Sequence, residues 1–77
     1  MTVITAEYEH ELFKRSVSLL TPGARGFVWI AGWMDPRPVY TIIFKNGAVF
    51  EGQIKHKVFE EAKTYAKGVH RLTGEFP

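Results

Sequence analysis

The sequence lacks cysteine altogether, and it contains a single aspartate and only two serines in 77 residues. Without thiols, a disulfide framework and a thiolate–zinc site are both excluded, so a non-covalent core must hold this short chain together. Asp35 lies in a proline-flanked turn, and Ser16 and Ser18 have no histidine beside them. Neither a nucleophilic triad nor a paired-carboxylate site is therefore indicated.

The three histidines, His10, His56 and His70, are scattered and do not form a metal-ligand motif. His10-Glu11 begins like the helix motif of zinc proteases, but the position of the second histidine is Lys14. No glycine-rich phosphate loop precedes a predicted helix. The sequence therefore predicts a protein that is not an enzyme and that binds no metal or cofactor.

Long hydrophobic runs and strong net charge are also missing. The longest apolar run, residues 27–34, falls far short of the ~20 residues that span a bilayer. Residues 1–7 carry neither a basic segment nor a long apolar one, so they do not resemble a signal peptide. We therefore expect a cytoplasmic protein without a membrane partner. A net charge of +2 permits a nucleic-acid partner but does not require one.

The clearest positive signal is a β-hairpin over residues 39–54, centred on Asn46-Gly47. This dipeptide favours a two-residue turn with both residues at positive φ, and such a turn would pair Ile43 with Phe50. Partners share a face of the sheet. In this register the core face carries Val39, Thr41, Ile43, Phe50 and Ile54. The opposite face carries Tyr40, Ile42, Phe44 and Val49 beside Glu51 and Gln53.

Helical patterns flank the strands. Residues 5–20 predict a helix with Thr5 as its N-cap and two apolar lines, Tyr8, Leu12 and Leu19 in one and Phe13, Val17 and Leu20 in the other. The two lines form either one broad core-facing arc or two separate contact surfaces. Residues 27–33 predict a strand that is apolar on both faces, which is typical of a central or doubly covered strand. Residues 57–71 predict a second helix with a buried line of Phe59, Ala62, Ala66 and Val69.

The predicted fold is therefore a single small α+β domain over residues 1–77, in the order αβββα. A three-stranded antiparallel sheet built on the 39–54 hairpin packs with an N-terminal and a C-terminal helix. Residues 1–4 and 73–77 are expected to be frayed.

The apolar and aromatic surface predicted for this chain exceeds what one small core can bury, which favours a protein-binding function. We expect an accessory or inhibitory factor, of the type that phages use against host machinery, which docks on a larger protein or forms a homodimer. The candidate protein-binding residues are Tyr8, Leu12, Leu19, Trp33, Tyr40, Ile42, Phe44 and Val49. The alternative is nucleic-acid binding by the basic side of the second helix. Its candidate residues are Lys55, Lys57, Lys63, Lys67, His70 and Arg71.

Overall fold

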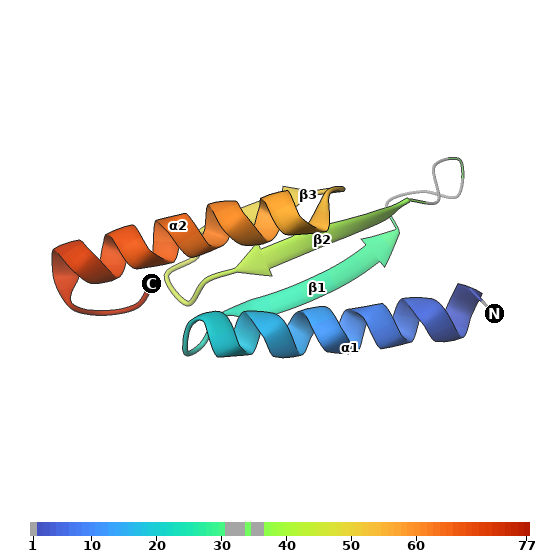
Figure 1. The fold of residues 1–77 in the computed structure, drawn as a ribbon, viewed down its shortest axis with the longest axis horizontal. Coiled ribbons are helices and arrows are strands. Elements are labelled where there is room, and N and C mark those ends of the chain that lie inside the picture. The colour runs from blue at the N-terminus through green and yellow to red at the C-terminus, as the bar shows by residue number, and fades with distance from the viewer. Residues whose placement is uncertain (1, 31–33, 35–36) are drawn as a thin grey trace.

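A computed structural model describes the backbone of residues 2–30, 34 and 37–77, and the side chains of these residues from residue 10 onward. The elements follow the predicted αβββα order. They are α1 (Thr2–Leu20), β1 (Arg25–Ile30), β2 (Pro38–Ile43), β3 (Val49–Gly52) and α2 (Lys55–Thr73). In Figure 1, α1 runs alongside β1, while α2 lies over β2 and β3.

The three strands form one antiparallel sheet in the order β1-β2-β3, so the central strand is β2. The strand β1, predicted to be either central or covered on both faces, is an edge strand. In the register, Ile42 pairs with Gly26 on one side and with Phe50 on the other. One row further along, Tyr40 pairs with Val28 and Gly52. These two rows lie on the same face of the sheet, because positions two apart in a strand point the same way.

Both helices cover that same face, and two glycines let them approach it. A Cβ placed on Gly26 would lie 2.8 Å from a Val17 methyl group of α1. A Cβ placed on Gly52 would lie 3.0 Å from a Val58 methyl group of α2. The core lies between the helices and this face, where Phe13, Val17 and Ile42 are fully buried. The opposite face of the sheet has no helix on it in the described part of the chain.

The hairpin turn is one residue longer than predicted, which corrects the register. The amide of Gly47 donates to the carbonyl of Phe44 (2.9 Å), and the amide of Phe44 donates to the carbonyl of Ala48 (2.8 Å). Gly47 has a φ of 94°, whereas Asn46 does not have a positive φ. The turn is thus a three-residue loop with one left-handed glycine. Ile43 consequently pairs with Val49 rather than Phe50.

This one-residue shift reverses the two faces of β2, because side chains alternate along a strand. Tyr40, Ile42 and Phe44, predicted to lie on the outer face, are 9%, 0% and 2% exposed in the core. Val39, Thr41 and Ile43, predicted to face the core, lie on the face without helices. The prediction of the two faces of β2 was therefore wrong.

The helices extend beyond their predicted bounds. Because α1 begins at Thr2, Thr5 lies inside the helix and is not its N-cap. The helix α2 runs through Gly68 to Thr73 and ends in Gly74, which is left-handed and donates its amide to the carbonyl of His70 (2.7 Å). The buried residues of α2 are Val58, Ala62 and Ala66, whereas Phe59 and Val69 are only half-buried.

Candidate functional site

The face of the sheet opposite the helices is apolar and partly exposed. Trp29 on β1 is 44% exposed, Phe27 beside it is 37% exposed, and Val49 on β3 is 55% exposed. The residues of this open sheet face are Arg25, Phe27, Trp29, Val39, Thr41, Ile43, Val49 and Glu51. Among the described residues no helix packs over this face, although His10 of α1 contacts Phe27 at its edge, with ring centroids 6.2 Å apart. An exposed apolar face is a common feature of interaction sites.

Hydrogen bonds connect the side chain of Trp29, on the edge strand β1, to the two other strands. The indole N–H of Trp29 donates to the hydroxyl of Thr41 (2.9 Å), and that hydroxyl donates to the Glu51 carboxylate (3.2 Å). The three residues therefore form a polar chain that crosses all three strands. Because the hydrogen bond holds the indole over β2, Thr41 is only 6% exposed. Trp29 thus presents a fixed aromatic surface to solvent.

The predicted protein-binding residues are not gathered on one surface. Tyr40, Ile42 and Phe44 belong to the core, and Val49 lies on the open sheet face. On α1, Leu19 is 84% exposed while Leu12 is half-buried. The side chain of Tyr8 and the whole of Trp33 lie outside the described residues.

Sequence reasoning missed Phe27 and Trp29 as candidates for the open surface. The two residues lie two positions apart on β1 and therefore share one face of the sheet. The sequence did not show which face of β1 the helices cover. The two nearby glycines carry this signal, since Gly26 and Gly52 lie where α1 and α2 approach the sheet.

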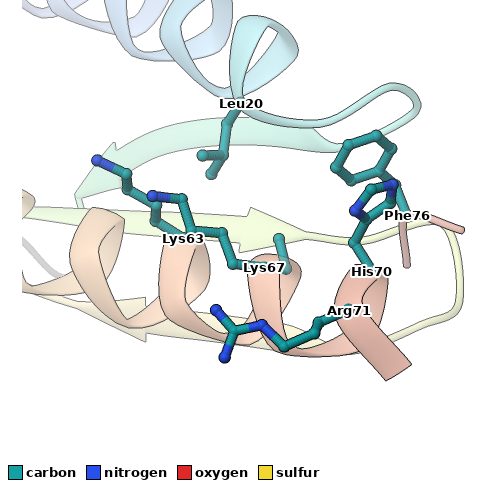
Figure 2. A pocket seen from close by; sticks show the side chains of 7 residues that line it. Leu20, Lys63, Lys67, His70, Arg71 and Phe76 are labelled. Carbon is teal, nitrogen blue, oxygen red and sulfur yellow. The ribbon is translucent and has the colours of Figure 1, made fainter. Parts of the chain in front are cut away.

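A second candidate site is a cavity of about 480 Å³ between the end of α1, the second half of α2 and the C-terminal tail. Figure 2 shows Leu20 pointing toward it from α1 and Phe76 lying over His70. The rings of His70 and Phe76 are stacked, with centroids 4.3 Å apart and an interplanar angle of 14°. Its lining residues are Leu20, Lys63, Ala66, Lys67, His70, Arg71 and Phe76.

The structure brings four of the six predicted basic residues together in this cavity: Lys63, Lys67, His70 and Arg71. They recur at three- and four-residue spacing on α2 and thus lie on neighbouring turns. The other two are separate from the cavity. Lys55 lines a smaller hollow with Ser16 and Glu60, and Lys57 lies in a different hollow beside Glu51 and Glu61.

Within the described residues, no group of three histidine or acidic side chains is arranged to hold a metal ion. Neither α1 nor α2, as far as the structure describes them, combines the length and the apolar character needed to cross a bilayer. Comparison with protein-family models, with curated proteins and with solved structures finds no match to this chain.

Proposed function

We propose that this chain is a small protein-binding module that docks on a larger protein through its open sheet face. The observation that carries the proposal is the apolar, aromatic surface around Trp29, on the side of the sheet opposite both helices. A module of this size acts by covering a surface of its partner. This mode of action suits an accessory or inhibitory factor.

The geometry of Trp29 supports a role as the main anchor. Tryptophan is enriched among the few residues that supply most of the binding energy at protein interfaces. Its hydrogen bond to Thr41 fixes the ring before a partner arrives, which lowers the entropy lost on binding. Phe27 and Val49 lie on either side of the central strand and extend the apolar contact area. Standard interfaces take ~800 Å² from each partner, so the partner must extend beyond these few side chains.

The charge on this face favours a different protein over a second copy. Two copies could pack face to face about a two-fold axis that passes through Thr41 in the plane between the sheets. If the axis runs parallel to the strands, Glu51 lies over Phe27 of the other copy. If it runs across the strands, Glu51 lies over Glu51 of the other copy. In neither arrangement does a cation lie directly opposite the Glu51 carboxylate, because Arg25 of this face lies in the next row. Burying a carboxylate without a directly opposed cation costs several kcal/mol in typical proteins. The partner we propose therefore carries an apolar patch with a lysine or arginine placed to meet Glu51.

The test begins with capture of the partner from an extract of the organism that encodes the chain, followed by binding measurements with the purified partner. Val49→Lys places a charge in the apolar contact area at a side chain that is 55% exposed, so the fold is retained. We expect this variant to bind at least about tenfold more weakly than the wild type. Glu51→Lys should also weaken binding, because it removes the partner of the proposed cation.

Leu72→Lys is the matched control, since Leu72 is 86% exposed on α2 and lies on no surface proposed for docking. It should bind the partner as the wild type does. Equal affinity of Val49→Lys and the wild type would refute docking through the open sheet face. A wild-type dimer in light scattering that Val49→Lys dissociates would show that the face pairs with a second copy instead.

A further inference from the structure

We propose that the cavity between α1, α2 and the tail binds a nucleotide, with its phosphate on the lysines of α2 and its base against Phe76. This site lies on the helical side of the molecule, so it is independent of the proposed docking face. A volume of about 480 Å³ is within the usual range for small-ligand sites.

The charge of the cavity is uniformly positive. Lys63, Lys67 and Arg71 line it together with His70, and no carboxylate is among the lining residues. In the part of the chain that the structure describes, these three cations form no ion pair with an acidic side chain. Figure 2 shows the amines of Lys63 and Lys67 on the side of α2 that faces Leu20, while the guanidinium of Arg71 lies farther from Leu20. Three neighbouring cations without a carboxylate form a suitable site for phosphate oxygens.

The other side of the cavity is apolar and flat. Phe76 stacks on His70 with one face of its ring, and it remains 43% exposed. Leu20 and Ala66 supply the aliphatic part of the lining. Inorganic phosphate would use only the cationic side. A nucleotide would use both sides, because every base has a flat aromatic face that stacks on an aromatic side chain.

The bound nucleotide can be either a free mononucleotide or one unit of a single-stranded nucleic acid. We propose to titrate the isotope-labelled chain with adenosine monophosphate, with a short oligonucleotide and with inorganic phosphate, following the amide resonances by NMR. Adenosine monophosphate should shift residues 63–76 in a saturable way and bind at least about tenfold more tightly than phosphate. A tighter, strongly salt-dependent complex with the oligonucleotide would identify the strand as the source, and equal affinity would identify the free nucleotide.

Two variants separate this site from general charge attraction. Lys67→Gln, which removes a cavity cation, should weaken binding of adenosine monophosphate by about tenfold, whereas Lys57→Gln, on the same helix but outside the cavity, should leave it unchanged. Phe76→Ala should reduce affinity for the nucleotide but not for phosphate. No saturable shifts, or equal losses in Lys67→Gln and Lys57→Gln, would overturn the proposal.

Discussion

The contact between Gly26 and α1 allows a quantitative test of the packing. An alanine Cβ at position 26 would lie 2.8 Å from Cγ2 of Val17, 3.1 Å from its Cβ and 3.1 Å from Cδ2 of Phe13. Val17 and Phe13 are fully buried, so neither can move aside into solvent. Gly26→Ala must therefore displace α1 from the sheet or force a side chain out of its preferred rotamer.

The expected costs can be estimated from this geometry. Overpacking of a core typically costs about 1–3 kcal/mol. Alanine also lowers the conformational entropy of the unfolded chain relative to glycine, which offsets part of this cost and leaves about 1–2 kcal/mol. Val17→Ala removes two buried methyl groups and leaves a cavity, at about 2–3 kcal/mol. In the double variant the new methyl group at position 26 fills the space of the lost ones. We expect the double variant to lose only about 2–3 kcal/mol, rather than the sum of about 3–5 kcal/mol.

Urea unfolding would measure these free energies for the wild type, both single variants and the double variant. The comparison requires that the slope of the unfolding free energy against urea concentration is the same in all four proteins. Gly26→Ala combined with Val58→Ala is the matched control, because Val58 approaches Gly52, whereas the atoms nearest to a Cβ at position 26 belong to Val17 and Phe13. That pair should be additive. Additivity in the Gly26–Val17 pair would refute the close approach of α1 to β1.

Two further glycines have open space around their Cβ positions, so substitutions there test the backbone alone. Gly47→Val should destabilise the fold by about 1–2 kcal/mol, because φ at this position is +94° and a β-branched residue is strained there; an unchanged melting temperature would contradict the turn. Gly68→Ala should stabilise the fold by about 1 kcal/mol, because position 68 lies inside α2 and alanine favours helix; a loss of stability in thermal denaturation would contradict open space at this position.

The order and type of the elements could be predicted from sequence because each has its own local pattern. The strong alternation of the hairpin and the helical spacing of small and apolar residues in α2 do not depend on distant contacts. The bounds were less accurate, and α2 begins at Lys55 and ends at Thr73 instead of spanning 57–71.

The register of the hairpin could not be predicted, because Asn-Gly suits both a two-residue and a three-residue loop. A distant contact accompanies the longer loop in this structure. The side chain of Asn46 accepts a hydrogen bond from the Ala48 amide (3.0 Å) and donates one to the hydroxyl of Tyr65 on α2 (3.0 Å). Tyr65 itself packs against Phe44 and Phe50. No pattern within the hairpin encodes this contact with a helix.

The candidate surfaces show the same division between local and distant information. The basic side of α2 was visible from spacing along one helix, and four of its residues do line one cavity. An open apolar face of the sheet was predicted, but it was assigned to Tyr40, Ile42 and Phe44. Which residues of β2 share a face with β3 depends on the register of the hairpin. In the observed structure the exposed face instead carries Phe27 and Trp29, which share it with Thr41 and Val49.

The strand order β1-β2-β3 has a consequence for how the chain folds. Each element packs on its neighbour in the sequence: α1 on β1, β1 on β2, β2 on β3, and β3 on α2. Such connections close short loops, and folds with mainly local contacts reach the native state quickly. During synthesis, α1 and β1 emerge first and can meet across Gly26 before β2 exists. The contact between Phe13 and Tyr40 forms only after β2 has packed against α1 and β1, and it then joins the first half of the chain to the second.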